Sequence, residues 1–343
     1  MFESLSLPLV VGAFALAAFV VLVLGTKMAG LADRIADSTG LGEAVTGGLL
    51  LGAATSLSGT VVSLTAALDG RAGLAFSNGI GGIAAQTAFL ALADTVYRKA
   101  NLEHSAADVT NVFQAALLSL MLVVPLGAVL TPDMSFWSVH PASVVLLVIY
   151  LLGAYRTADM KENPMWEAVD TKETRHDTPD KETTSKERPS RQIAAFVAMM
   201  LVLGVAGWVI AQSATQITDR LDLSAALVGA LMTAVVTSLP ELVTTLAAVR
   251  RGALQLAVGG IIGGNSFDVL FLTLSDFGYR EGSLYHAIGS GDLFWLVVGQ
   301  AMTAVLLLGL IVREKQGPGG IGWESVLMLS IYGGAVGFQA WSG

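Results

Sequence analysis

Two stretches of this sequence decide the fold: Thr-Ser-Leu-Pro-Glu at 237–241, and Gly-Gly-Ile-Ile-Gly-Gly-Asn-Ser-Phe-Asp at 259–268. Each places residues that interrupt a helix beside a carboxylate, within a long apolar run. Glu241 and Asp268 are the two of the 27 acidic side chains that lie well inside such runs. A carboxylate inside a membrane is costly and usually marks the path of an ion or a proton. The two stretches therefore predict interrupted membrane helices that carry an ion site.

The composition around these stretches is that of a membrane protein. The chain has 343 residues, of which 54% are hydrophobic and 13% charged, whereas soluble domains carry about 25% charged residues. Ten apolar runs are long enough to cross about 30 Å of hydrocarbon as helices. They lie at 7–30, 41–68, 74–97, 109–130, 137–156, 192–218, 223–249, 253–276, 286–312 and 320–341. We predict an all-α membrane protein with ten transmembrane helices, whose partners are the lipid bilayer and inorganic cations.

Several function classes are disfavoured by the same inventory. The chain has no cysteine, which excludes disulfides, thiolate chemistry and Cys-ligated zinc. A net charge of −8 argues against a nucleic-acid partner. The sequence contains no P-loop, dinucleotide fingerprint or nucleophile–base arrangement, so we expect neither an enzyme nor a bound cofactor. The sequence leaves the oligomeric state open.

The distribution of Lys and Arg predicts the orientation. One set of short loops carries three basic residues, Arg71, Arg220 and Arg280, and the other carries fifteen, eight of them from Arg156 to Arg191. Because basic loops stay in the cytoplasm, we expect both termini outside a prokaryotic-type inner (plasma) membrane and the 157–191 loop in the cytoplasm. That loop is rich in charge and poor in apolar residues, which is typical of a disordered linker.

An internal repeat divides the chain. At an offset of 182, residues 25–94 match residues 207–276 without a gap at 25 of 70 positions. The offset spans five predicted helices, an odd number, so the two copies enter the membrane from opposite sides. The predicted organisation is a first five-helix half (1–156), the charged loop (157–191) and a second five-helix half (192–343).

Inverted repeats with interrupted helices are a design of secondary transporters, which bind their substrate near the membrane midplane. Carboxylate and hydroxyl oxygens suit Na⁺, Ca²⁺ or Mg²⁺, or a proton relay. Glu241 and Asp268 could instead be protonated groups that hold helices together. Lys27, at the end of the first span, either extends to the interface or reaches in and replaces a cation.

The first copy of the repeat lacks the negative charge of the second. Gly59 stands at the position of Glu241, and Gln86 at that of Asp268. Its remaining oxygen donors are neutral: Thr55, Ser56, Ser58, Asn78 and Gln86. For Asn78 and Gln86, hydrogen bonding between helices is an equally good explanation.

These residues resemble the cation/calcium exchanger superfamily, and within it the sodium/calcium exchanger-like membrane proteins. The family signature in each repeat is Gly-Thr-Ser-Leu-Pro-Glu followed by Gly-Ser-Asn-x-x-Asn/Asp. Residues 237–241 and 264–268 match the second copy, with Gly264 where the family usually has Ser. The resemblance covers essentially the whole chain, and it implies two inverted five-helix halves, a cytoplasmic loop and outside termini.

The resemblance also implies the site. Glu241 and Asp268 would bind the cation, with oxygens from the neighbouring Thr and Ser, and the first and sixth spans would move against the other helices. The family has a second Glu where this chain has Gly59, so one carboxylate pair is left to neutralise one divalent ion, or about two Na⁺ or H⁺. The predicted site residues are Glu241, Asp268, Thr237, Ser238, Thr55, Ser56, Gln86 and Asn78.

Three functions remain open from the sequence. The first is a secondary active cation antiporter that resembles sodium/calcium exchangers and works by alternating access. The second is a proton-coupled or monovalent cation exchanger that no longer transports Ca²⁺, as the loss at Gly59 suggests. The third is a membrane sensor or scaffold without transport. The sequence does not identify the exchanged cations, among which Na⁺, Ca²⁺ and H⁺ are the candidates.

Overall fold

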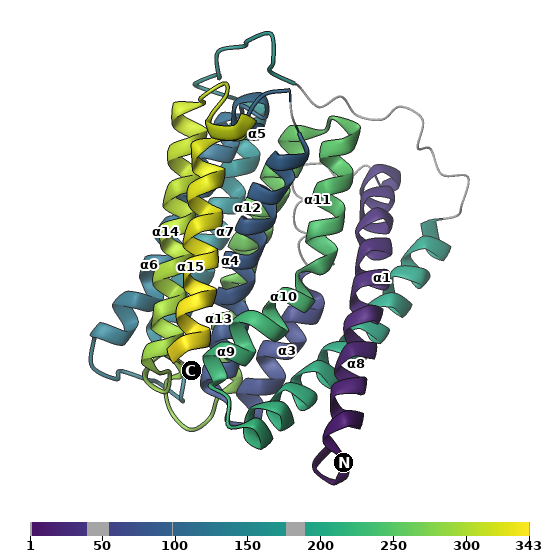
Figure 1. Cartoon of the computed structure of the whole chain (residues 1–343), viewed down its shortest axis with the longest axis vertical. Helices are drawn as coiled ribbons and strands as arrows, with labels where there is room; N and C mark the ends of the chain where they lie inside the picture. The colour runs from purple at the N-terminus through teal and green to yellow at the C-terminus, as the bar shows by residue number, and fades with distance from the viewer. Residues whose placement is uncertain (1, 40–54, 98, 176–188, 343) are drawn as a thin grey trace.

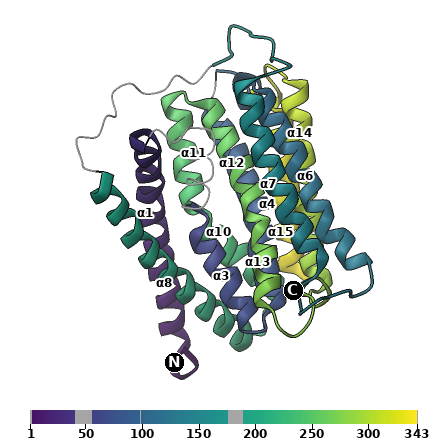
Figure 2. The same ribbon diagram turned by 180° about the vertical axis from the view of Figure 1, so that it is seen from behind.

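The computed structural model describes residues 2–39, 55–97, 99–175 and 189–342. Within these ranges the chain forms an elongated bundle of helices (Figure 1 and, from behind, Figure 2). Both termini lie at the lower end of the bundle in Figure 1, and the segment that follows α7 lies at the upper end. This arrangement agrees with an even number of membrane crossings.

Within the described ranges, seven helical runs are long and apolar enough to cross a membrane. They are α1 (Leu7–Thr39), α4 (Ala72–Val96), α6 (Val109–Leu130), α7 (Pro141–Glu162), α8 (Pro189–Leu221), α12 with α13 (Leu254–Asp268 and Leu270–Gly278) and α14 (Ser290–Val312). An eighth is a pair of helical segments bent by 45°. Its parts are α9 (Ala225–Leu227), the π-helical turn η2 (Val228–Thr233), α10 (Ala234–Thr237) and α11 (Leu239–Arg251).

The remaining elements are shorter or less apolar. They are α3 (Leu57–Leu68), α5 (Leu102–Ser105), α15 (Trp323–Ser342), and the short turns η1 (Phe2–Ser4), η3 (Leu284–His286) and η4 (Pro318–Gly320). Of the second predicted span, 41–68, the first part lies outside the described residues and the rest is α3. The described residues thus support an all-helical membrane fold with seven or eight candidate spans, and the count of ten stays a prediction.

Helix α4 forms the centre of the bundle. It is buried along nearly its whole length, with α14 and α15 on one side and the bent pair on the other. The close approach depends on glycine, since a Cβ on Gly81 would lie 2.4 Å from Cα of Ala230 in η2. In a membrane, helices associate through such small residues. This contact brings the bent pair against α4.

Hydrogen bonds repeat across the two halves. Near its C-terminal end, α4 carries a buried aspartate that accepts two backbone N–H groups, and α13 carries its counterpart near its own end. The bonds measure 2.7–3.0 Å and pair off at an offset of 182: Asp94 with Leu102 and Gly322, Asp276 with Leu284 and His140. The sequence repeat covers 25–94 and 207–276, but these paired hydrogen bonds also involve residues outside those ranges. The structural equivalence of the two halves is therefore longer than the stretch of matching sequence.

The long helices α1 and α8 also make equivalent contacts. They pack against each other as an X at one side of the bundle. A Cβ on Gly25 of α1 would lie 2.5 Å from Cγ of Pro240, at the start of α11. A Cβ on Gly207 of α8 would lie 2.8 Å from the carbonyl oxygen of Ser58, at the start of α3. Each long helix thus crosses a helix start of the other half through a glycine.

The charged loop is more ordered than the sequence suggests. Helix α7 continues to Glu162, and the next residues dock on α5, where Nε2 of His104 lies 2.9 Å from Oγ1 of Thr171. The prediction of a disordered linker is therefore wrong for residues 157–162, which are helical, and for residues 169–175, which these contacts hold against α5 and the end of α14. Residues 176–188 lie outside the described residues.

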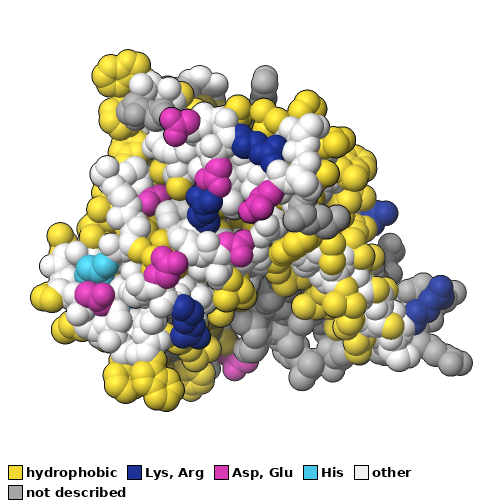
Figure 3. All heavy atoms as spheres, turned by 90° about the horizontal axis from the view of Figure 1, so that it is seen from below, with side chains coloured by type: hydrophobic (Ala, Val, Ile, Leu, Met, Phe, Trp, Pro, Cys, Tyr) yellow, Lys and Arg dark blue, Asp and Glu magenta, His cyan; other side chains and the backbone are white. Residues whose placement is uncertain are grey.

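Polar groups collect at the lower end of the bundle. Figure 3 shows acidic and basic side chains in the middle of this face and hydrophobic ones around its margin. One pair is bidentate, with the guanidinium of Arg71 donating to the carboxylate of Asp219 at 2.8 and 2.5 Å. This distribution is what a helical bundle presents where it leaves the hydrocarbon.

Candidate cation site

The break in the bent helix positions Glu241. Helix α10 ends at Thr237 and α11 begins at Leu239. Pro240 occupies the first turn of α11, where its missing N–H costs nothing because that N–H would have no helical partner. Glu241 lies in the same turn and is 5% exposed. A carboxylate at a helix N-terminus is stabilised by the helix dipole, so the break creates a place for this buried charge.

Asp268 lies at a second break. It is the last residue of α12, one residue before α13 begins, and is 2% exposed. From α4, Gln86 donates through Nε2 to Oδ2 of Asp268 at 2.6 Å and to Oγ of Ser238 at 3.3 Å. This amide joins the two broken helices, so the sequence alternative of an interhelical hydrogen bond holds for Gln86.

The structure brings all eight predicted site residues together. Seven of them line one small cavity: Ser56, Asn78, Gln86, Thr237, Ser238, Glu241 and Asp268. The eighth, Thr55, hydrogen-bonds the carboxylate of Glu241. The residues come from the start of α3, from α4, from the bent pair and from α12, so tertiary packing assembles the site from both repeats.

Five oxygen atoms of this cavity have no well-formed hydrogen bond to any described residue. They are Oγ of Ser56, Oδ1 of Asn78, Oε1 of Gln86, Oε2 of Glu241 and Oδ1 of Asp268. Buried polar atoms are nearly always paired, so five acceptors around one cavity point to a cation as their common partner. The cavity volume is about 10 Å³, which is about the space of one water molecule and suits one small ion.

Two other predicted residues also have structural roles. Asn78 donates through Nδ2 to the carbonyl oxygen of Gly59 at 3.1 Å and to Oγ of Ser63 at 2.9 Å. Thr237 donates its hydroxyl to the carbonyl oxygen of Thr233 at 2.9 Å. Asn78 therefore ties α3 to α4, while its free Oδ1 remains in the cavity.

Three further residues of the cavity were not predicted as site residues: Gly59, Gly82 and Phe271. Phe271 matters most, because a Cβ on Gly59 would lie 2.7 Å from Cε2 of its ring. The aromatic ring thus occupies the space beside Gly59 into which a larger side chain would extend. The loss of the family's glutamate at Gly59 was visible in the sequence, but which residue fills the space was not.

Lys27 takes no part in the site. Its side chain is exposed, and it does not line the cavity that holds Glu241 and Asp268. The alternative in which its ammonium replaces a cation is therefore wrong for this structure.

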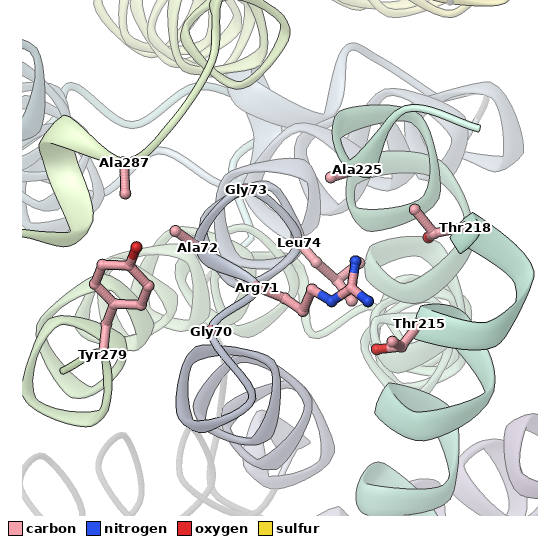
Figure 4. Close-up of a pocket in the computed structure, with 10 residues that line it drawn as sticks. All are labelled: Gly70, Arg71, Ala72, Gly73, Leu74, Thr215, Thr218, Ala225, Tyr279 and Ala287. Atoms are coloured by element: carbon pink, nitrogen blue, oxygen red, sulfur yellow. The ribbon is translucent and has the colours of Figure 1, made fainter. Parts of the chain in front are cut away.

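A larger cavity lies away from the carboxylate pair. Its volume is about 220 Å³, and Figure 4 shows its lining, which includes Arg71, Thr215, Thr218 and Tyr279. The guanidinium of Arg71 is already engaged by Asp219, and no acidic side chain lines this cavity. Its size does not make it the better candidate for a cation.

Comparison with known proteins places this site in a family. The family model described as sodium/calcium exchanger protein matches residues 9–157 and 191–341. An uncharacterised membrane protein of Methanocaldococcus jannaschii, MJ0091, is 25% identical over 308 residues, which is 88% of each chain. The Escherichia coli inner membrane protein YrbG is 36% identical over 73 residues, 21% of this chain and 22% of its own.

Solved structures share the fold. The sodium-calcium exchanger NCX_Mj, soaked with 10 mM Na⁺ and 10 mM Sr²⁺, matches with a TM-score of 0.62 at 21% identity over 97% of this chain and 99% of its own. Native YfkE matches with a TM-score of 0.65 at 14% identity over 97% of each chain. Because the family model covers most of both halves, the chain belongs to the sodium/calcium exchanger protein family.

Proposed function

We propose that this protein is a secondary active cation antiporter whose cargo binds between Glu241 and Asp268. One observation carries the proposal: five oxygens without a well-formed hydrogen bond, two of them from carboxylates, surround a cavity for about one ion. The donor set contains only oxygen, which suits hard cations such as Na⁺ and Ca²⁺. The family and the fold support the same function.

The proposed exchange follows from the size and charge of the site. Because the cavity holds about one ion, two different cations compete for the same carboxylates and exclude each other. We expect a ten-helix topology with inverted repeats. In it, α1 and α8 would slide across the other helices and so open the site to each side of the membrane in turn. The contacts of Gly25 and Gly207 with the opposite half support this motion. An ion gradient would drive it, with the loop after α7 in the cytoplasm.

Flux measurements test the antiport. Purified protein in liposomes should release a preloaded cation only when a second cation is supplied on the other side. Na⁺, Ca²⁺ and H⁺ are each offered as cargo and as driver, with protein-free liposomes as the control. Absence of exchange for every pair would contradict the proposal and would favour a sensor or scaffold.

Phe271 and Gly59 favour a second candidate, an exchanger of protons or monovalent cations. The ring of Phe271 lies beside Gly59, where the family has a glutamate, so the described site has two carboxylates. One of them, Asp268, already accepts a hydrogen bond from Gln86. A weaker negative charge favours ions of lower charge. Uptake of labelled Ca²⁺ driven by a Na⁺ gradient, without a pH gradient, would contradict this second candidate.

Gly25→Ala tests the crossing of α1 over the bent helix. We expect it to destabilise the described conformation by about 1–3 kcal/mol, because the new methyl overlaps Pro240 and overpacking carries that cost. The measurement is thermal unfolding in detergent, together with exchange rate in liposomes. Gly12→Ala on the same helix is the matched control, since its Cβ meets nothing within 4 Å. Equal melting temperatures for the two variants would contradict the close crossing.

A further inference from the structure

A group of buried carboxyl side chains lies far from the Glu241–Asp268 pair, at the upper end of the bundle. Asp94 of α4, Glu103 of α5 and Glu324 of α15 each have 0% exposure. The carboxyl group of Glu103 interacts electrostatically with those of the other two. Three such groups without a counter-charge are strongly unfavourable in a low-dielectric interior.

Two of these carboxyl groups lack the backbone hydrogen bonds that Asp94 accepts. Both oxygens of Asp94 accept backbone N–H groups, at 2.8 Å each. By contrast, all four carboxyl oxygens of Glu103 and Glu324 lack a well-formed hydrogen bond to any described residue. The buried hydroxyl of Ser325 lies next to the carboxylate of Asp94 rather than against either glutamate. The group thus contains more acceptors than the surrounding backbone satisfies.

The opposite end of the bundle provides an internal comparison. At the offset of 182, Tyr285 takes the place of Glu103, and Ala142 that of Glu324. There Asp276 is the one carboxyl group of the network: Ser143 donates to it at 2.6 Å and lies 2.9 Å from the hydroxyl of Tyr285. The fold therefore needs only the aspartate, and the two glutamates are additions at one end.

Among the described residues, no cationic side chain forms an ion pair with either glutamate. Lys99, in the connection before α5, is exposed. After α14, Arg313 donates to the carbonyl oxygen of Val169 at 2.9 Å and Lys315 pairs with Glu173 at 2.5 Å. The ring of His104 faces away from the group, toward Thr171 and the carbonyl oxygen at 313. The near end of α12, at 254–258, is uncharged, and Glu314 adds a further negative charge near Glu324.

A proton fits these observations better than a metal ion. In the described part of the chain, no three acidic or histidine side chains are placed to hold a metal, and both oxygens of Asp94 are already used. Burial, reinforced by the charges of Asp94 and Glu324, raises the pKa of Glu103 well above its ordinary value. Two neighbouring carboxyl groups can share one proton, since both cannot be charged at low cost.

We propose that Glu103 and Glu324 form a proton-binding site, separate from the cation site, at the end of the bundle where residues 169–175 dock. Release of its proton leaves two negative charges facing each other between α5 and α15. Because α5 also receives the backbone N–H of Arg175 at 2.9 Å, proton release is expected to loosen the docked segment.

Infrared spectroscopy of the purified protein tests the site directly. The wild type should lose a carboxylic-acid carbonyl band between about pH 5 and about pH 9, above the ordinary range of glutamate. Glu103→Gln and Glu324→Gln should each remove this band, whereas Glu241→Gln and Asp268→Asn should keep it. The exposed Glu281 supplies the control variant, Glu281→Gln. A wild type without the band, or a band that survives in both Gln variants, would overturn the proposal.

Thermal unfolding provides a second readout. The folded protein keeps a proton that the unfolded chain has released, so stability falls as the pH rises above the ordinary pKa of glutamate. Both Gln variants should flatten that decline and melt several degrees above the wild type at about pH 8, with a smaller difference at about pH 5. If a Gln variant does not fold, Glu324→Ala replaces it in the comparison, because alanine is the residue found at the equivalent position 142 of the other half. A Na⁺-, Ca²⁺- or Mg²⁺-dependent stabilisation that Glu103→Gln removes and Glu241→Gln keeps would assign the site to a metal instead.

Discussion

Glu241→Gln is expected to abolish cation exchange, with a loss of at least about 100-fold in rate. The substitution keeps the size of the side chain but removes half of the carboxylate charge around the cavity. Removing one partner of a buried charged set costs about 3–5 kcal/mol, and each 1.4 kcal/mol is about a factor of ten in affinity. The measurement is exchange in liposomes with the cation pair that the wild type transports.

The fold of this variant should remain intact. Neutral Gln is easier to bury than a carboxylate, so the melting temperature without cations should not fall, while the rise that a transported cation produces should disappear. Glu162→Gln, at the exposed end of α7, makes the same change away from the site and should transport as the wild type. Exchange at a normal rate by Glu241→Gln would mean that the cation binds elsewhere.

Gly59→Glu alone is expected to destabilise the protein rather than to restore a stronger Ca²⁺ site. The sequence suggests that the family's glutamate could simply be put back. In the structure, however, its Cβ would lie 2.7 Å from the ring of Phe271, a distance at which something must shift. Overpacking of this kind costs about 1–3 kcal/mol, which thermal unfolding would detect as a lower melting temperature.

The double variant Gly59→Glu with Phe271→Ala should behave differently. Removing the ring makes room for a third carboxylate next to the cavity, and the dissociation constant for Ca²⁺ should fall at least about tenfold, or about 1.4 kcal/mol. Gly59→Gln with Phe271→Ala has the same shape without the charge and is the matched control, and Phe271→Ala alone measures the effect of the space. Titration of Ca²⁺ by calorimetry compares the four proteins. Equal affinity in the Glu and Gln double variants would show that position 59 does not face the ion.

The sequence predicted most of the fold because membrane helices are local in origin. Apolar length alone locates α6, α7, α8 and α14, since lipid forces each segment to satisfy its own backbone hydrogen bonds. The helix break at Pro240 was also predictable, because proline interrupts a helix wherever it occurs. The interior of the second predicted span lies outside the described residues, so the full count of spans still depends on the sequence.

The site was predicted in its residues but not in its arrangement. Glu241 and Asp268 stood out because charge is rare inside apolar runs, and all eight predicted residues meet around the carboxylate pair. The two glutamates at the upper end did not stand out, because Glu103 lies between two apolar runs and Glu324 near the start of another, where charge is common. Only the packing of α5 against α12 and α14, and of α15 against α4 and α14, buries them.

By itself, the sequence determined that this chain is a membrane protein with a twofold internal repeat and that one copy alone carries the intramembrane carboxylates. These properties follow from composition, spacing and internal identity, which need no tertiary contact. Only the tertiary structure decided that Gln86 donates to Asp268 and that Phe271 fills the space beside Gly59. Each of these pairs joins residues far apart in the chain, and which distant side chains meet depends on the packing of the whole bundle rather than on local pattern.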